Sequence, residues 1–179
     1  MKKNIIVGIC GSIAIYKSCE VVRKLIKNKW NVKVIMTKNA QKFVSPLTFE
    51  VLSKNPVYID MFEKNVYEED HIALSDFADL ILVCPATANI IGKIACGICD
   101  DLLTTTIISF PGTVIFAPAM NENMWKNKIV VGNVEKLKKY GYLFIGPGKG
   151  ELASGKRGIG RLVDPEKIIN FVEKIHKKF

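Results

Sequence analysis

Two short segments of the chain combine residue types that bind small polar ligands. Residues 118–125 read PAMNENMW, in which Asn121 and Asn123 offer amide donors to a carboxylate and the Met and Trp side chains offer an apolar wall. Residues 8–17 read GICGSIAIYK, in which the glycines permit close approach and the Ser12 hydroxyl can donate to a phosphate. Met and Trp often pack in cores and a Gly-rich turn need not bind anything, so each segment alone leaves a purely structural interpretation open.

A third segment and one histidine extend this set. Residues 85–93 read PATANIIGK, where Thr87 and Asn89 are suited to cap a helix and also to contact a planar ring with a phosphate tail. His71 is one of only two histidines in the chain. A single histidine is more often structural than catalytic, but imidazole titrates near neutral pH. His71 is therefore the histidine that we expect to act as a base or proton shuttle.

The hydrophobic pattern predicts the elements that position these residues. Short β-branched runs predict buried strands at 4–10, 31–37, 80–84, 113–120 and 142–146. Amphipathic spacing predicts helices at about 12–28, 88–99, 102–109, 131–140 and from 165 onward. Strands that alternate with helices predict parallel strands joined by right-handed crossovers. We expect a single domain over residues 1–179, a three-layer, doubly wound α/β sandwich of Rossmann-like or flavodoxin-like type.

Ligands of such sheets bind beyond the carboxyl ends of the strands. The three segments described above each follow a predicted strand, so we expect them to meet at one edge of the sheet. Residues 146–161 form a long Gly-rich stretch, which we expect to be a functional or mobile loop.

Charge and cysteine content exclude several classes of function. The net charge is +9, but the Lys and Arg residues are mostly scattered and do not interleave with aromatic residues, so we expect an ordinary basic surface that helps to attract a phosphorylated substrate rather than a nucleic-acid site. No apolar run is long enough to cross a membrane, and the opening residues do not resemble a secretory leader. We therefore expect a cytoplasmic protein whose five cysteines are reduced. Cys96 and Cys99 form a lone C-x-x-C within a helical pattern, which favours core packing over a metal site.

Four separated motifs, taken in order, resemble the homo-oligomeric flavin-containing cysteine decarboxylases. They are GSIAIYK at 11–17, PATAN at 85–89, PAMNENMW at 118–125 and GELASGKRGIGRL at 150–162. His71, followed by ADLIL, completes the order, and the resemblance covers about residues 5–169. Two further stretches, KFVSPLTFEVLSKNPVY and GICDDLLTTT, are similar to the coenzyme A branch of this family rather than to its peptide-modifying branch.

The resemblance implies FMN as cofactor and assigns roles to individual residues. The implied cofactor-binding residues are Gly11, Ser12 and Ile13 near the phosphate, Thr37, Lys38 and Asn39 near the flavin, Thr87, Ala88, Asn89 and Ile90 along the ring and ribityl chain, and Ala119 against the flavin. The implied substrate-binding residues are Asn121, at the carboxylate, with Met124 and Ala153. His71 matches the catalytic histidine of the family. No metal is implied.

The implied reaction is FMN-dependent decarboxylation of 4'-phosphopantothenoylcysteine to 4'-phosphopantetheine in coenzyme A biosynthesis. The flavin oxidises the cysteine side chain to a thioaldehyde, carbon dioxide leaves, and the enethiol is reduced again. The alternative is a peptidyl-cysteine decarboxylase that stops at the enethiol. The family also includes phosphatase-binding regulatory subunits, whose long acidic extensions are absent from this basic sequence, and flavin prenyltransferases share the fold, but PAMNENMW and His71 speak against them.

One departure from the family pattern bears on this choice. The coenzyme A enzymes usually carry a Cys in the last motif as proton donor for the reduction, and Ser154 stands at that position here. A hydroxyl is a far weaker acid than a thiol. Three interpretations stay open: donation by Ser154 or a water, donation by another residue, or arrest at the enethiol. We favour full turnover with another proton source, because the other motifs match the coenzyme A branch.

The resemblance also implies partners. The family works as homotrimers, in some members assembled into dodecamers, with FMN and substrate at the subunit interface. A phosphopantothenate–cysteine ligase domain or partner is expected for the bifunctional form, and the sequence leaves open whether this chain is free-standing or part of such an enzyme.

Overall fold

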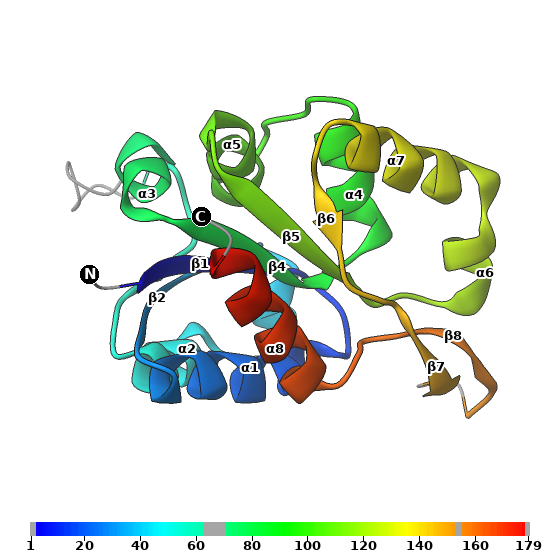
Figure 1. The fold of residues 1–179 in the computed structure, drawn as a ribbon, viewed down its shortest axis with the longest axis horizontal. Helices are drawn as coiled ribbons and strands as arrows, with labels where there is room; N and C mark the ends of the chain where they lie inside the picture. Colours follow the sequence, from blue (N-terminus) through cyan, green and yellow to red (C-terminus); the bar gives the residue numbers. More distant parts are fainter. Residues whose placement is uncertain (1–2, 63–70, 153–154, 178–179) are drawn as a thin grey trace.

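A computed structural model describes residues 3–62, 71–152 and 155–177. Its centre is a parallel sheet with the strand order β3-β2-β1-β4-β5-β6 (Figure 1). The strands are β1 (Lys3–Ile9), β2 (Trp30–Met36), β3 (Val57–Tyr58), β4 (Leu80–Ala86), β5 (Thr113–Pro118) and β6 (Leu143–Phe144). The order reverses direction between β1 and β4, and this switch point is where doubly wound sheets open a crevice for ligands.

Helices cover both faces of the sheet (Figure 1). One face carries α1 (Ile15–Lys27), α2 (Pro46–Ser53) and α8 (Pro165–His176), with the short η1 (Ala40–Lys42). The other face carries α3 (His71–Phe77), α4 (Ala88–Ala95), α5 (Leu102–Ser109) and α7 (Lys128–Lys139). The short α6 (Glu122–Lys126) lies beside an antiparallel hairpin of β7 (Gly148–Glu151) and β8 (Arg157–Arg161) at the carboxyl edge of the sheet.

The alternation of side chains along the strands divides the core in two. In β1, Ile5 and Val7 pack under α1 and α8, whereas Ile6 points to the opposite face under α3 and α5. All three side chains are fully buried, which stabilises the fold by roughly 1.5–3 kcal/mol each. A central strand buried on both faces requires the continuous apolar run that the sequence shows, and the predicted three-layer doubly wound fold is confirmed.

The helix predicted at 88–99 is shorter than expected, and this corrects the interpretation of its two cysteines. The helix ends at Ala95 because Gly97 adopts a left-handed conformation, with φ of +69°. The Ile98 amide donates to the Lys93 carbonyl at 2.9 Å, which closes a glycine C-cap. Beyond this cap the chain leaves the core, so Cys96 and Cys99 are exposed rather than packed inside.

The segment at 146–161 was expected to be a loop and is instead largely the β7–β8 hairpin. Glycines at 148, 150, 158 and 160 occupy the positions where an alternating strand would show apolar residues, and this conceals the period of two. No helix or strand was predicted at the positions of α2, β3, α3 or α6. Within the described ranges, no helix has both the length and the apolar character that a membrane span requires.

Candidate active site

The loops that follow four neighbouring strands enclose a cavity of about 670 Å³, here called cavity A. Its wall contains Gly11 and Ser12 after β1, Thr37–Asn39 after β2, Thr87–Ile90 after β4, and Ala119 and Met124 after β5. The structure therefore gathers in one place most of the residues to which a cofactor role was assigned. The volume falls within the roughly 300–1,000 Å³ usual for small-molecule sites.

A second cavity of about 480 Å³, cavity B, adjoins the first. The two cavities share Ser12, Ala119 and Met120. Cavity B also contains Ile13 from the β1–α1 turn and Asn121 from the β5–α6 turn, so the remaining cofactor residue and the predicted carboxylate ligand lie here. Its outer wall comes from the β7–β8 hairpin.

The turn after β1 owes its shape to close packing. A Cβ on Gly11 would lie 2.7 Å from the Cβ of Asn39, so only glycine lets this turn approach the loop after β2. The Ser12 hydroxyl accepts a hydrogen bond from the Ala14 amide at 3.3 Å. Together these contacts direct the β1–α1 turn toward the space between the two cavities.

Thr87 begins α4 at the wall of cavity A. Its hydroxyl accepts a hydrogen bond from the Ile90 amide at 3.3 Å, so the predicted capping role is confirmed for Thr87. Asn89 is not the cap; it lies in the first turn with its side chain exposed to the cavity. A polar side chain that the helix does not use remains available to a ligand.

Asn121 combines a structural and a chemical role. Its side-chain oxygen accepts a hydrogen bond from the Asn123 amide at 2.8 Å and so caps α6. This bond occupies the oxygen and leaves the NH₂ group free to donate, which is the geometry that a carboxylate ligand needs. Met124 of α6 is half exposed on cavity A, whereas Trp125 packs against the core.

The hairpin is fixed to this same turn. The Ile159 amide donates to the Glu122 carboxylate at 3.3 Å, and the Met120 amide donates to the Gly160 carbonyl at 2.9 Å. A Cβ on Gly160 would collide with the Met120 carbonyl oxygen at 2.2 Å. Gly160 therefore permits a close contact between its backbone and that of Met120, and this contact positions Asn121 in the wall of cavity B.

Comparison with known proteins agrees with this architecture. Residues 1–177 match the family model described as "Flavoprotein". The chain belongs to this flavoprotein family.

Two curated relatives are similar to the chain over nearly its whole length. The chain is 49% identical to the "Coenzyme A biosynthesis bifunctional protein CoaBC" of Bacillus subtilis (strain 168), over 96% of this chain and 43% of that protein. It is 42% identical to the "Probable phosphopantothenoylcysteine decarboxylase" of Streptococcus mutans serotype c, over 97% of this chain and 98% of that protein. The chain thus spans less than half the length of the bifunctional relatives that it matches.

Solved structures share the fold over the whole chain. A PPC decarboxylase mutant complexed with pantothenoylaminoethenethiol superimposes with a TM-score of 0.87 at 29% identity, covering 99% of this chain and 100% of that one. The FMN-dependent cysteine decarboxylase SpaF superimposes with a TM-score of 0.85 at 27% identity, covering 98% of each chain. Both solved structures therefore share the architecture of this flavoprotein.

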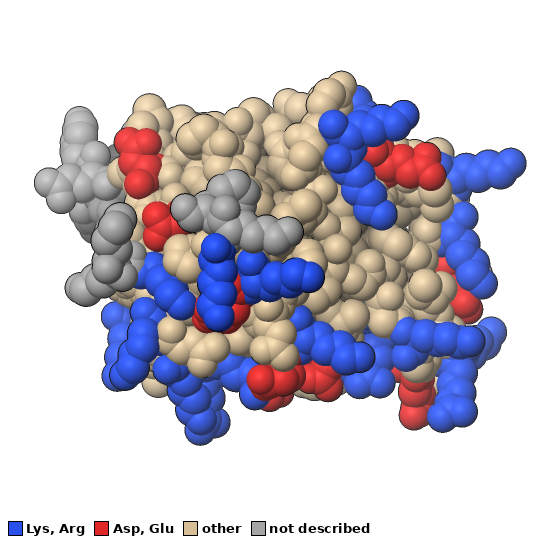
Figure 2. Space-filling view, viewed as in Figure 1, with Lys and Arg blue, Asp and Glu red and all other residues tan. Residues whose placement is uncertain are grey.

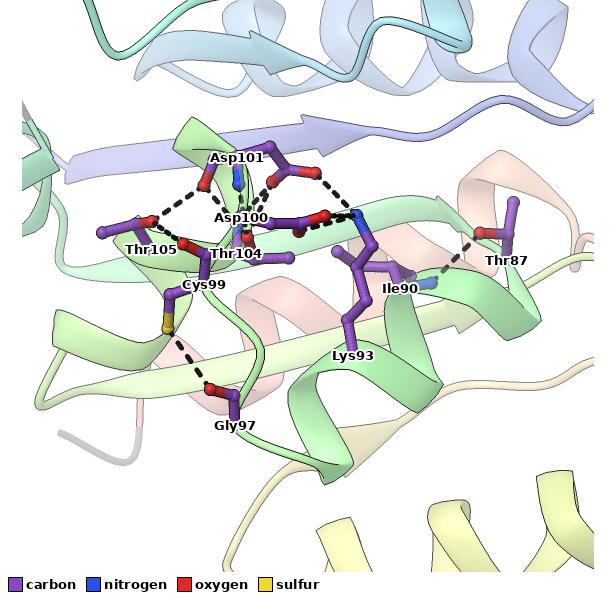
Figure 3. A network of polar contacts seen from close by, with 9 residues as sticks. All are labelled: Thr87, Ile90, Lys93, Gly97, Cys99, Asp100, Asp101, Thr104 and Thr105. Atoms are coloured by element: carbon purple, nitrogen blue, oxygen red, sulfur yellow. Dashed lines mark hydrogen bonds and ion pairs between the residues drawn. The ribbon is translucent and has the colours of Figure 1, made fainter.

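An ion cluster in cavity A was not predicted from the sequence (Figure 3). The Lys93 ammonium lies 2.7 Å from an Asp100 oxygen and 3.3 Å from an Asp101 oxygen. Partial burial alone would lower the pKa of Lys93, but the two carboxylates more than offset it and raise this pKa, while the bond from Lys93 lowers the pKa of Asp100. The cluster ties the end of α4 to the start of α5 as a charged wall of the flavoprotein's cavity.

Asp101 also explains the start of α5. Its carboxylate accepts a hydrogen bond from the Thr104 amide at 2.8 Å, and the Thr104 hydroxyl accepts one from the Asp101 amide at 3.1 Å. This is a capping box, and the D-L-L-T spacing is the sequence signal that could have revealed it.

Cys10 lines cavity A but does not offer a thiolate. Burial raises the pKa of its thiol to about 12, so the group is neutral at physiological pH. Cys84, buried beside Ser18, has its pKa raised to about 12 for the same reason. Neither cysteine has the lowered pKa of a catalytic thiol.

His71 lies apart from both cavities. It begins α3, which packs against α5, and its side chain is half buried at that position. Of the described residues that line cavities A and B, none is a histidine. A single chain therefore does not bring His71 together with Asn121, although the resemblance pairs them in one reaction.

Ala153 and Ser154, the other two predicted site residues, lie outside the described residues. The positions that flank them are close to each other, since the Gly155 amide donates to the Leu152 carbonyl at 2.9 Å. Leu152, the last described residue before them, lines cavity B.

Proposed function

We propose that the chain is an FMN-dependent phosphopantothenoylcysteine decarboxylase, which converts 4'-phosphopantothenoylcysteine to 4'-phosphopantetheine. The observation that carries this proposal is the convergence of the loops after β1, β2, β4 and β5 on two adjoining cavities, with Asn121 in the wall of cavity B next to the shared Met120. The similarity to relatives of both the bifunctional and the free-standing kind supports the same reaction.

Cavity A fits FMN by the chemistry of its wall. Ala88, Ile90, Ala119 and Met124 offer apolar surface to a planar ring, and Thr37–Asn39 with Asn89 offer polar groups to its edges and to the ribityl chain. The backbone at residues 11–13, next to the start of α1, offers the Gly11 and Ile13 amides and the Ser12 hydroxyl to the phosphate. When bound, FMN supplies the oxidation and the later reduction of the cysteine side chain.

The chain's own residues bind and orient the substrate. The free NH₂ of Asn121 donates to the substrate carboxylate and holds it next to cavity A, where the bond to carbon dioxide breaks. Met124 and Met120 form an apolar wall around this carboxylate, which favours loss of the neutral product from the charged group. The Lys93 cluster keeps the wall of cavity A polar without adding a free cation, because two carboxylates flank its ammonium.

His71 takes part through assembly. We infer a homotrimer, alone or within a dodecamer, in which His71 of the partner subunit reaches cavity A or B and moves a proton near the substrate thiol. Exposed apolar side chains beside cavity B support a subunit contact there: Ile13 is 57% exposed and Tyr16 is 62% exposed.

The wider context is proposed on the same basis. Residues 1–179 act as one flavoprotein unit in the cytoplasm. A phosphopantothenate–cysteine ligase, as domain or partner, supplies its substrate, as the bifunctional relatives indicate.

Purified protein tests the proposal directly. After loading with FMN, it should release carbon dioxide from 4'-phosphopantothenoylcysteine and form 4'-phosphopantetheine, identified by mass. The second candidate, a peptidyl-cysteine decarboxylase, is favoured by Ser154, which stands where the resemblance leads us to expect a thiol. A product that lacks two hydrogens, or turnover only of a peptide ending in cysteine, would replace the first candidate with the second.

A further inference from the structure

We propose that Arg161, together with Lys17 of α1, forms a phosphate subsite in cavity B that selects a phosphorylated substrate over a peptide ending in cysteine. This inference rests on the proposed function and names the part of the site that decides between its two candidate substrates. Both residues line cavity B.

Arg161 has a defined position at the end of β8. Its backbone pairs with Gly148 of β7, and its side chain extends along the hairpin over Gly150. A Cβ on Gly150 would lie 3.0 Å from the Arg161 Nη1 and 3.4 Å from its Cδ. Because Gly150 has no side chain, the Arg161 guanidinium can lie over it. Arg161 lines cavity B from this position on the hairpin.

Among the described residues, neither cation has a carboxylate partner. In the part of the chain that the structure describes, Lys3, Lys24, Lys93 and Lys126 pair with carboxylates at 2.6 to 3.7 Å. Arg161 and Lys17 make no such pair there, and the Lys17 ammonium lies over the Tyr16 ring, 5.9 Å from its centroid. Arg161 is exposed and Lys17 is half-buried, and a phosphate in cavity B gains charge-assisted hydrogen bonds from both.

One carboxylate lines the same cavity. Glu151 is exposed on β7 and lies opposite Arg157 in the hairpin register, on the other end of β8 from Arg161. The charged lining of cavity B therefore carries a net charge of +1, from Lys17, Arg161 and Glu151. Figure 2 shows that Lys and Arg side chains also gather around the edge of the molecule where the hairpin lies, which favours the approach of a phosphorylated ligand.

The arrangement matches the two ends of the proposed substrate. Its carboxylate and thiol belong near Asn121, next to Met120, which both cavities share, and its phosphate belongs at the Arg161 guanidinium, which lies over Gly150 of the hairpin. Apolar residues of the same cavity wall, Ile13, Leu152 and Leu162, suit the branched hydrocarbon of the pantothenoyl group. A peptide that ends in cysteine would present uncharged backbone to Arg161 and would leave both cations unpaired.

The test compares two ligands that differ only in the phosphate. FMN-loaded protein is titrated calorimetrically with 4'-phosphopantetheine and with pantetheine, and kcat and KM are measured for phosphopantothenoylcysteine and pantothenoylcysteine. Wild type should prefer each phosphorylated compound. Arg161→Gln should weaken binding of 4'-phosphopantetheine and raise KM for phosphopantothenoylcysteine roughly 10- to 100-fold, with the unphosphorylated compounds and kcat unchanged. Arg161→Lys should restore part of the preference.

A control variant and the opposing outcomes keep this inference separate from the proposed function. Arg157→Gln removes a charge from the same strand outside both cavities and should change nothing. Equal binding of both ligands by wild type, or an equal loss of both in Arg161→Gln at full FMN content, would overturn the phosphate subsite. A retained phosphate preference without release of carbon dioxide would leave the subsite standing and refute the proposed reaction.

Discussion

The two edges of the central sheet differ in how far their polar side chains are paired with one another. At the amino edge, polar groups satisfy one another: Glu173 of α8 accepts hydrogen bonds from the Trp30 indole at 2.7 Å and from the Lys3 ammonium at 3.0 Å. The His176 ring packs edge-on against Trp30, with centroids 4.8 Å apart. We call Lys3, Trp30, Glu173 and His176 the amino-edge cluster. Nearby, Asn4, Asn31 and Asn55 form a ladder of side-chain bonds.

At the carboxyl edge, Lys93 pairs with Asp100 and Asp101, but several other polar residues are left unpaired. Among the described residues, the side chains of Lys38, Asn39 and Asn89 have no hydrogen-bond or ion-pair partner, and Asn121 uses only its oxygen. Close packing of backbone at Gly11 and Gly160 holds these groups in place instead. The contrast teaches that saturated polar contacts stabilise this fold, while unsaturated polar groups on rigid backbone mark its binding site.

The largest expected effect concerns His71, which within one chain lies away from both cavities. His71→Asn should lower the rate of decarboxylation by about 10²–10⁴-fold, because a proton must move near the substrate thiol and Asn cannot carry it. Carbon dioxide release measures this rate, and flavin absorbance should be unchanged. Mixed oligomers of His71→Asn and Asn121→Asp subunits should regain activity if His71 acts across an interface. Full activity of the His71→Asn protein would remove this residue from the mechanism.

Asn121→Asp sharpens the contrast at the carboxyl edge itself. Asp retains the oxygen that caps α6 but replaces the NH₂ donor with a negative charge, so the substrate carboxylate should be repelled. We expect carbon dioxide release to fall by about 10²–10³-fold, with stability and FMN content preserved. Asn127→Asp is the matched control, because Asn127 caps α7 through the same bond, to the Ile129 amide at 2.9 Å, outside both cavities. Equal losses in the two variants would contradict the role of Asn121.

The amino-edge cluster should govern stability and its dependence on pH, without affecting turnover. Partial burial alone would raise the pKa of Glu173, but bonds from Trp30 and Lys3 more than offset this and lower the pKa below the usual 4.5. A carboxyl group whose pKa is lower in the folded state stabilises the fold above pH 4.5. This stabilisation is lost as the pH falls through the pKa of the folded state. Glu173→Gln should therefore cost about 1–2 kcal/mol near neutral pH, measured by urea unfolding, and the difference from wild type should vanish in acid.

An exposed pair on the same helix provides the control for this prediction. Glu166 contacts Lys24 at 2.6 Å, but its side chain is 59% exposed, and exposed pairs contribute little. Glu166→Gln should leave the unfolding curve nearly unchanged at every pH. A loss of activity in Glu173→Gln at full stability would break the division between the two edges.

The sequence predicted the carboxyl edge better than the amino edge, for a physical reason. Strand periodicity places loops after β1, β4 and β5 at one edge, so local motifs sufficed to gather Ser12, Thr87 and Asn121. The amino-edge cluster joins Lys3 and Trp30 to Glu173, which lies some 140 or more positions away, and no local pattern encodes such a contact. The cluster of Lys93 and Asp100 was missed because it depends on where α4 ends, which Gly97 decides.

The smallest expected effect comes from comparing a helix cap at cavity A with a helix cap outside both cavities. Thr87 caps α4 at cavity A, and Asp164 caps α8 by accepting from the Glu166 amide at 3.1 Å, outside both cavities. Thr87→Ala and Asp164→Ala should each lower stability by about 1 kcal/mol, since each leaves a helix amide without its partner. Only Thr87→Ala should also weaken FMN binding, by a few-fold, because its hydroxyl and the α4 amides face the cofactor cavity. Fluorescence titration of the apoprotein with FMN measures this difference, and equal affinities in the two variants would show that capping is the whole role of Thr87.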